Sequence, residues 1–235
     1  MDGSGDRPSK RPRGRPPGLT AQGAAARQRL YDTAIALIAE RGYEATTLRE
    51  VADRAHVSVG LLYRYFPSKR AVVLALYDDL SAAYASRAAE MRQGKWRDRF
   101  IFALTTSLEV LAPHRQTLGA LVPVLVGDAS EGLFAPATAF SRTRVQGVFH
   151  EAVRGASDAP RAEMTEPLGR LLYLAHLAVL LWWLLDKSPR QRATVALVAL
   201  IKQALPAGAL TLRFKQVRTF LIAGDALFRE ALLEG

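Results

Sequence analysis

The sequence contains no cysteine, so it can form neither a disulfide framework nor a thiolate-based metal or redox site. It also lacks the His-Glu-x-x-His motif, the Gly-x-Ser-x-Gly motif and a glycine-rich phosphate loop. Its four histidines show no metal-ligand spacing, and its first residues are polar rather than an apolar signal segment. These absences favour a cytoplasmic protein that is not an enzyme and that uses no metal or cofactor.

The charge is strongly positive. The 235 residues carry a formal net charge of +10, which favours a polyanionic partner such as nucleic acid. Because 49% of the residues are hydrophobic, the chain can form a small head and one larger domain with its own core. We therefore expect a DNA-binding protein with two folded parts.

Residues 47–69 predict two short helices joined by a turn. Thr47 and Glu50 form a capping box at the start of the first helix. Ser58 is placed to cap the second helix, and Pro67 ends it. This pattern is typical of a helix-turn-helix, which places one short helix in the major groove of DNA.

The second of these helices has two distinct faces. Leu62 and Phe66 are four residues apart and should face the core. Tyr63 then lies at the edge of the opposite face, and the absent side chain of glycine keeps that face open to the groove. The residues expected to point toward solvent or DNA are Gly60, Leu61, Arg64 and Tyr65.

At these residues the chain resembles the TetR family of bacterial one-component regulators, whose DNA-binding domains carry a similar Gly-x-Leu-Tyr-x-x-Phe-x-x-Lys run. The resemblance covers roughly the N-terminal third of the chain, from Ala34 to about Tyr77. The remainder matches the family only in being helical. Arg70 departs from the pattern, because many relatives have an acidic residue there, but a basic side chain could reach a phosphate.

The resemblance implies a set of DNA contacts. Arg49 would contact a base or phosphate, Gly60 and Leu61 would face base edges, and Lys69 would bind phosphate. Tyr63 and Tyr65 would reach the backbone or a base. Plainer roles stay open for some of them, since a tyrosine can be mostly core and an arginine simply solvated. The complete predicted set is Thr47, Arg49, Ser58, Gly60, Leu61, Tyr63, Arg64, Tyr65 and Lys69.

A second DNA-binding signal precedes this unit. The segment Lys10-Arg11-Pro12-Arg13-Gly14-Arg15-Pro16-Pro17-Gly18 is similar to an AT-hook, in which Arg13 and Arg15 would lie along the floor of a narrow minor groove. An ordinary basic tail would instead add phosphate affinity without base preference. Both interpretations assign the tail to DNA.

The rest of the chain predicts further helices, so the fold class is all-α. A linking helix from 69 to about 91 is followed by helices at 97–112, 114–126, 134–155, 165–186, 189–205 and 211–232, with a break at Pro206-Ala207-Gly208. We expect an N-terminal three-helix helix-turn-helix domain and a C-terminal helical bundle. The expected divisions are a basic arm at 1–23, the DNA-binding domain at 24–78, and a ligand-binding and dimerisation domain at 95–235.

The segment at 171–185 is apolar on every side. A membrane span needs roughly 20 apolar residues, and this run falls short of that length between Arg170 and Asp186. We therefore expect a helix buried on both faces, partly against a second copy of the chain, and no membrane partner. In the resembled family, late helices pair into an intersubunit four-helix bundle, which implies a homodimer. Whether 165–186 would pair with 189–205 or with 211–232 stays open.

The resemblance also implies a ligand cavity in the larger domain. An apolar wall would suit a small hydrophobic effector. The same aromatic stripe could also be plain core, and a histidine in it could be structural. The candidate ligand-binding residues are Phe102, Phe149, Tyr173, His176 and Trp183.

These observations together predict a dimeric transcriptional regulator that binds a palindromic operator in double-stranded DNA and is released by an unknown small-molecule effector. Repression rather than activation follows from the family alone. The alternative is a non-specific architectural DNA-binding protein that relies on the basic arm.

Overall fold

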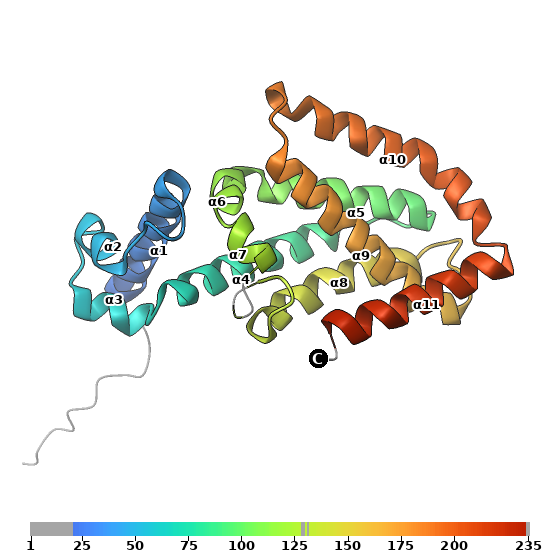
Figure 1. Ribbon diagram of the computed structural model, residues 1–235. Helices are drawn as coiled ribbons and strands as arrows, with labels where there is room; N and C mark the ends of the chain where they lie inside the picture. Colours follow the sequence, from blue (N-terminus) through green and yellow to red (C-terminus); the bar gives the residue numbers. More distant parts are fainter. Residues whose placement is uncertain (1–20, 128–129, 131, 234–235) are drawn as a thin grey trace, which may run out of the picture.

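The computed structural model describes residues 21–127, 130 and 132–233, and within them the chain forms helices and no strand. Helices α1 (Ala21–Arg41), α2 (Leu48–Arg54) and α3 (Val59–Tyr65) form a small head at one end of the molecule (Figure 1). Helix α4 (Lys69–Ala88) runs from the head into a larger helical domain. The predicted all-α fold, with an N-terminal helix-turn-helix and a C-terminal helical domain, is confirmed.

The larger domain is built around α4. Helices α5 and α8 pack on α4, α9 packs on α8, α10 packs on α5 and α9, and α11 packs on α9. Its elements in chain order are α5 (Trp96–Leu111), η1 (Ala112–His114), α6 (Arg115–Ala120), α7 (Val122–Gly127), η2 (Pro136–Thr138), α8 (Ala139–Arg154), α9 (Ala162–Leu185), η3 (Pro189–Gln191), α10 (Arg192–Thr211) and α11 (Lys215–Leu232).

The core of the head brings together all four N-terminal helices. Leu30 and Leu37 of α1, Val51 of α2, Leu62 of α3 and Leu76 of α4 are all buried in it. The same core continues beyond the head into α6 and α7 through Leu118, Leu121, Val124 and Leu125. The head is therefore joined to the larger domain by packed side chains as well as by the linking helix.

A second core fills the larger domain. Tyr84 of α4, Phe100 and Leu104 of α5, Phe149 of α8 and Tyr173 of α9 are buried in it. The rings of Phe149 and Phe100 have centroids 6.0 Å apart, and those of Phe149 and Tyr173 are 6.3 Å apart. Aromatic contacts thus hold α5, α8 and α9 together.

The single helix predicted at 114–126 is wrong. The structure divides this segment at Leu121 into α6 and α7. Pro123 is the physical reason, because it has no N–H group to bond the carbonyl four residues earlier and so cannot continue an α-helix without interruption.

The break predicted at Pro206-Ala207-Gly208 is also wrong, because α10 runs through Pro206 to Thr211. A proline inside a helix leaves the carbonyl at position i−4 without its partner. Here that carbonyl belongs to Lys202, and both Lys202 and Pro206 are exposed, so water can take the missing bond.

Two helices are long and apolar enough to cross a membrane by length and composition, namely the segments Ala162–Leu185 and Pro189–Thr211. The first is therefore longer than the apolar run that the sequence pattern delimited. In Ala162–Leu185, 39% of the most apolar 18-residue stretch is buried inside the protein, as in a core helix. In Pro189–Thr211 the corresponding share is 6%. The second helix presents most of its apolar side chains to the outside of the single chain.

Candidate nucleic-acid interface and ligand cavity

The first helix of the motif begins at a side-chain cap. Thr47 has an extended backbone, and its hydroxyl accepts a hydrogen bond from the Glu50 amide at 3.2 Å. The Glu50 carboxylate contacts the Arg41 guanidinium at the end of α1. One half of the predicted capping box is therefore present, while the carboxylate of Glu50 ties α2 to α1.

The turn between α2 and α3 uses a left-handed residue. His56 has a φ of +52°, and the Val57 amide donates to the Ala52 carbonyl at 3.0 Å. Ser58 then caps α3, because its hydroxyl accepts a hydrogen bond from the Leu61 amide at 3.3 Å. Local side-chain and turn chemistry therefore fixes where α3 begins.

Helix α3 has the two faces that its sequence predicts. Leu62 is buried within α3, and Phe66 is buried at its C-terminal cap. On the opposite face Gly60 and Arg64 are exposed, and 47% of the Tyr63 surface is accessible to solvent. A side-chain Cβ built at Gly60 would meet no atom within 4 Å, so this face is open for a close partner.

The remaining predicted contacts differ in exposure. Arg49 is exposed on α2, whereas Leu61 is only half-buried. Tyr65 is half-buried and packs against the core of the head, so the predicted orientation toward solvent or DNA holds for only part of that side chain. The role of each residue in DNA binding stays a prediction.

Lys69 has partners inside the head. Its ammonium donates to the carbonyls of Tyr43 and Glu44 at 2.7 Å and 3.3 Å, and it lies 4.4 Å from the centroid of the Tyr43 ring. These contacts hold the start of α4 against the segment between α1 and α2. Phosphate binding by Lys69, which the resemblance implies, would have to share or replace these bonds.

Arg13 and Arg15 of the AT-hook-like arm lie outside the described residues. The minor-groove and phosphate-binding interpretations of the arm therefore both stay predictions.

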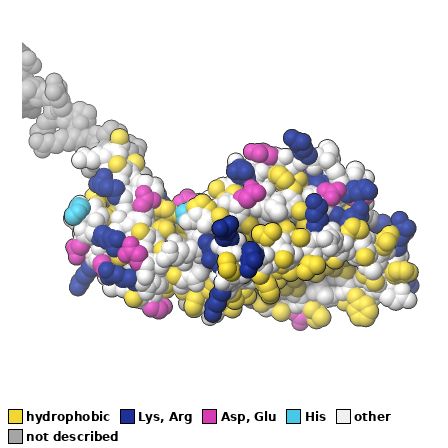
Figure 2. All heavy atoms as spheres, turned by 90° about the horizontal axis from the view of Figure 1, so that it is seen from above, with side chains coloured by type: hydrophobic (Ala, Val, Ile, Leu, Met, Phe, Trp, Pro, Cys, Tyr) yellow, Lys and Arg dark blue, Asp and Glu magenta, His cyan; other side chains and the backbone are white. Residues whose placement is uncertain are grey.

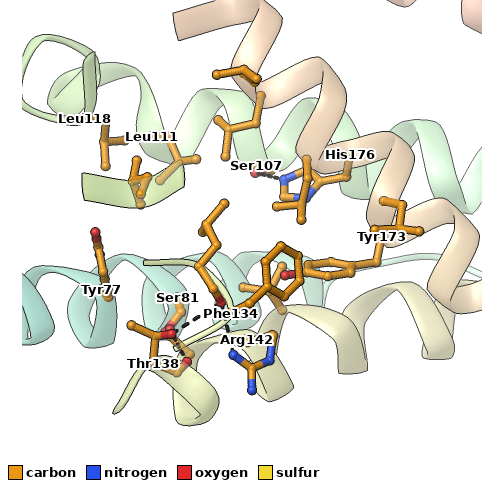
Figure 3. Close-up of a pocket in the computed structure, with 18 of the residues that line it drawn as sticks. Tyr77, Ser81, Ser107, Leu111, Leu118, Phe134, Thr138, Arg142, Tyr173 and His176 are labelled. Carbon is orange, nitrogen blue, oxygen red and sulfur yellow. Dashed lines mark hydrogen bonds between the residues drawn. The ribbon is translucent and has the colours of Figure 1, made fainter. Parts of the chain in front are cut away.

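The larger domain contains a cavity of about 420 Å³ between α4, α5, α8 and α9 (Figure 3). Helices α6 and α7 and the segment before α8 close one part of it, and α11 contributes Phe228 and Leu232 to the wall. The wall is mainly hydrocarbon, and Arg142 is the charged side chain among the described residues that line it. The cavity is thus suited to an apolar molecule.

Most polar groups on this wall already have partners. The Ser107 hydroxyl lies 2.8 Å from Nε2 of His176, and the Tyr84 hydroxyl donates to the Ala103 carbonyl at 3.1 Å. Arg142 donates to the carbonyls of Leu133 and Ala135 at 3.1 Å and 3.2 Å. These bonds fix the wall in place without a ligand.

Burial controls the ionisation of the wall. The pKa of His176 falls to about 4, because the buried imidazole would lose its hydration on becoming charged. The same cause raises the pKa values of Tyr84 and Tyr173 above their ordinary range. The imidazole and both phenols are therefore neutral at physiological pH.

Two of the five predicted ligand-binding residues, Tyr173 and His176, lie on the cavity wall. The other three do not line it. Phe149 is fully buried behind the wall, with its ring centroid 4.9 Å from that of His176. Trp183 is buried, and the guanidinium of Arg115 on α6 lies 5.5 Å from the centroid of its ring. Phe102 is half-buried elsewhere on α5.

The sequence pattern did not identify the cavity residues from other elements. Ser107 on α5, Arg142 on α8 and Phe134 before α8 come from segments that share no motif with α9. The only signal that could have found them is helical spacing, which marks the inward face of each helix but does not say which inward face borders a cavity.

The late helices carry apolar side chains that the single chain leaves uncovered. Seen from above, apolar groups are spread over much of the larger domain (Figure 2). Thr194 is the one fully buried residue of α10, and no described residue of α11 is fully buried. The most exposed large apolar residues of α9, α10 and α11 are Leu171, Leu181, Trp182, Leu185, Val195, Leu200, Leu210, Phe220, Ile222, Leu227 and Leu232.

Helix α11 is nevertheless anchored to α9. Arg170 donates to both carboxylate oxygens of Asp225 at 2.9 Å and 3.1 Å, and both side chains are largely buried. On the inner side, Phe228 meets Phe134 with ring centroids 5.8 Å apart. These contacts hold α11 over the cavity.

Comparisons with known proteins agree with this geometry. Residues 30–76 match the family described as bacterial regulatory proteins of the tetR family. The HTH-type transcriptional repressor KstR of Mycobacterium tuberculosis is 58% identical over 43 residues, which are 18% of this chain and 20% of that protein. The HTH-type transcriptional repressor NemR of Escherichia coli is 33% identical over 113 residues, which are 46% of this chain and 57% of that protein.

The match to KstR thus spans about a fifth of that repressor's length, and the match to NemR little more than half. The similarity in fold extends further. A tetR-family transcriptional regulator from Streptomyces coelicolor has a TM-score of 0.59 at 22% identity, and the match covers 87% of this chain and 89% of that one. Residues 30–76 therefore match the tetR family of bacterial regulatory proteins, and the fold of the chain is similar to that of a solved tetR-family regulator.

Proposed function

We propose that this protein is a cytoplasmic, dimeric repressor that binds a palindromic operator through residues 47–69 and is released by a small apolar ligand. The observation that carries the proposal is the capped α3 helix, whose outer face exposes Gly60, Tyr63 and Arg64. A short helix with this exposure can enter the major groove and read base edges. The repressor names of KstR and NemR support the direction of regulation.

The contacts on the two helices suggest how the head would bind. Arg49 on α2 and Arg64 on α3 are both exposed. Arginine can bind a phosphate or make a bidentate contact with guanine, so the two residues can position the head and contribute to sequence readout. The net charge of +10 would add affinity that depends on salt.

The uncovered apolar surface supports the proposed homodimer. Monomers rarely leave large contiguous apolar patches exposed, and a partner surface is the usual explanation. Helix α10 fully buries only Thr194 and α11 fully buries no residue within the single chain, and α9 exposes Trp182 and Leu185 close to the start of α10. We propose that all three late helices contribute to the interface, so that two heads can read the two halves of a palindrome.

Helix α6 offers a physical route between the cavity and the head. Gln116 donates to the Ala39 carbonyl of α1 at 3.2 Å, and Leu118 borders both the cavity and the core of the head. Arg115 donates to the carbonyls of Trp183 and Asp186 at 2.9 Å and 2.7 Å, which joins α6 to the end of α9. A ligand that favours one position of α6 would shift the population of DNA-competent dimers.

The test is the binding of the full-length protein to DNA flanking its own gene, compared with random DNA of equal length across a salt series. We expect one palindromic site to be preferred at about 0.2 M salt, where phosphate contacts alone are weakened. Arg49→Ala should reduce this preference. Arg92→Ala is the matched control, because it removes the same charge from an exposed position outside the head.

The alternative, an architectural DNA-binding protein, predicts a different result. Both DNAs would then bind equally, binding would collapse with salt, and the two arginine variants would behave alike. The same outcome in a selection from random sequences would contradict the repressor proposal.

A further inference from the structure

One buried nitrogen on the cavity wall has no partner. Among the described residues, four side chains bury a nitrogen that forms no hydrogen bond, and they belong to Gln146, His150, Arg170 and His176. Of these, only His176 lines the 420 Å³ cavity (Figure 3). Buried polar atoms without a partner are uncommon, but this Nδ1 atom has almost no surface that water can reach, so a bound molecule can satisfy it only after neighbouring side chains move aside.

The surroundings of His176 hold the ring in one position. Its Nε2 atom lies 2.8 Å from the Ser107 hydroxyl, and its ring stacks on Tyr84 at an interplanar angle of 4° with centroids 6.2 Å apart. Phe149 packs on the ring at 4.9 Å between centroids. The imidazole is therefore oriented before any ligand arrives, which lowers the entropic cost of forming a bond to Nδ1.

The other hydrogen-bonding groups of the wall are largely committed to the protein itself. The hydroxyls of Ser81, Thr138 and Ser141 each donate to a backbone carbonyl, at 3.1 Å, 2.8 Å and 2.9 Å respectively. Arg142 is held by two carbonyls of the segment before α8. A ligand with several polar groups would leave most of them unpaired in an apolar cavity, which is unfavourable.

The charge state of the ring narrows the class of ligand further. Because the buried imidazole is neutral at physiological pH, it offers a hydrogen bond but no charge to balance an anion. A neutral imidazole can donate or accept at Nδ1, depending on which nitrogen carries the proton. A hydroxyl group can satisfy either form, since it both donates and accepts, whereas a carbonyl can satisfy only the form with a proton on Nδ1.

We infer that the cavity binds an uncharged, mainly hydrocarbon molecule with a single hydroxyl or carbonyl oxygen, and that this oxygen bonds to Nδ1 of His176. The inference rests on the proposed function, because it identifies the chemistry of the effector. His176 is in this account the residue that selects a neutral oxygen over a carboxylate.

The experiment measures the binding of three probes of similar length to the full-length protein by calorimetry, in the absence of DNA. The probes are decan-1-ol, decan-2-one and decanoate. We expect decan-1-ol to bind about tenfold or more tightly than decanoate, because Arg142, the cation on the wall, already donates through Nη1 to two carbonyls and would only partly replace the hydration that a carboxylate loses. Equal binding of decan-1-ol and decanoate, or no binding of any probe, would overturn the inference.

Two variants separate a hydrogen bond from packing. His176→Phe keeps a ring that can stack on Tyr84 but removes Nδ1, so decan-1-ol should bind about tenfold more weakly while decanoate changes little. Leu180→Ala is the matched control, because Leu180 lines the same cavity with hydrocarbon alone and its truncation should weaken both probes alike. If His176→Phe also weakens both probes alike, the selective role of His176 is wrong.

A measurement on the unchanged protein covers the case in which His176→Phe does not fold. In ¹⁵N-histidine-labelled protein, burial lowers the pKa of both His150 and His176, and the His176 ring, whose pKa falls to about 4, should be the last to gain a proton as the pH falls. Saturating decan-1-ol should shift its Nδ1 resonance, and the absence of a shift would contradict the inference. Release of operator DNA is measured separately, so bound decan-1-ol that fails to release DNA would refute its effector role and leave the ligand chemistry supported.

Discussion

The head and the larger domain use polar groups in opposite ways. In the head, Thr47 and Ser58 cap short helices near the surface, and the charged residues Arg49 and Arg64 point outward. In the larger domain, by contrast, the His176 imidazole is buried against aromatic rings of the core. The head thus presents a polar surface, and the larger domain surrounds a partly open apolar cavity.

Because of this difference, we expect that substitutions can alter the head and the larger domain almost independently. Helix α6 is where the two meet. Leu118 and Leu121 of that region belong to the core of the head, while Leu118 also borders the cavity. Substitutions in the head should change DNA binding and leave ligand binding intact, and substitutions in the cavity should do the reverse.

The largest expected effect comes from Leu62→Ala. Leu62 is fully buried in the head, so its truncation should destabilise the head by about 2–5 kcal/mol and abolish operator binding. All three tryptophans lie in α5 and α9 of the larger domain, so unfolding in urea followed by tryptophan fluorescence reports on that domain.

Leu172→Ala is the matched control, because Leu172 is buried in the second core. It should lower the midpoint of the fluorescence transition more than Leu62→Ala does. An equal shift for both variants would show that the two cores unfold as one cooperative unit and would break the comparison.

The pH dependence of stability should come from the larger domain. The folded pKa of His176 is about 4 and its ordinary value is 6.5, so the unfolded chain takes up a proton below pH 6.5 that the folded chain does not yet bind. The stabilisation is therefore complete above about pH 6.5 and is lost as the pH falls toward 4, with about 2 kcal/mol lost between pH 7.5 and 5.

Urea unfolding at pH 7.5 and at pH 5 measures this loss. His176→Phe should remove that part of the pH dependence, while His56→Phe in the head should leave it unchanged. If the free energy of unfolding of His176→Phe changes with pH as much as that of the wild type, another group causes the pH dependence.

A smaller effect is expected at the cap of α3. Ser58→Ala removes the acceptor for the Leu61 amide and should cost about 1 kcal/mol in the stability of the head. Ser58→Asp should restore the cap, because an aspartate oxygen can accept the same bond. Comparing the amide exchange of α3 in the two variants with that of α9 would show whether the loss is confined to the head.

The smallest change in stability is expected from Gly60→Ala. A Cβ at this position meets nothing within 4 Å and alanine favours helix, so the free protein should be unchanged or more stable by up to about 1 kcal/mol. Operator affinity should nevertheless fall, because the added methyl group lies on the face proposed to approach the groove. Unchanged affinity would argue that Gly60 is not close to a base.

The same two regions differ in how far they could be predicted. The turn and both caps of the helix-turn-helix follow from residues no more than five positions apart, so their geometry is local and was predicted. The hydrogen bonds of Lys69 could not be predicted from its motif, because its partners Tyr43 and Glu44 are 26 and 25 residues away in the sequence. In the larger domain, Tyr173 and His176 could be placed on one stripe of α9, but Trp183 on the same stripe and Phe149 on α8 do not line the cavity.

The amino-acid sequence by itself determined the helical fold, the capped helix-turn-helix unit and the strongly positive charge, because helix periodicity, capping and charge depend on near neighbours or on composition alone. Only the tertiary structure decided which inward faces border a cavity, which imidazole nitrogen lacks a partner and which apolar helices remain uncovered. Those properties arise where segments distant in sequence meet or fail to meet, as Ser107 and His176 do across 69 residues.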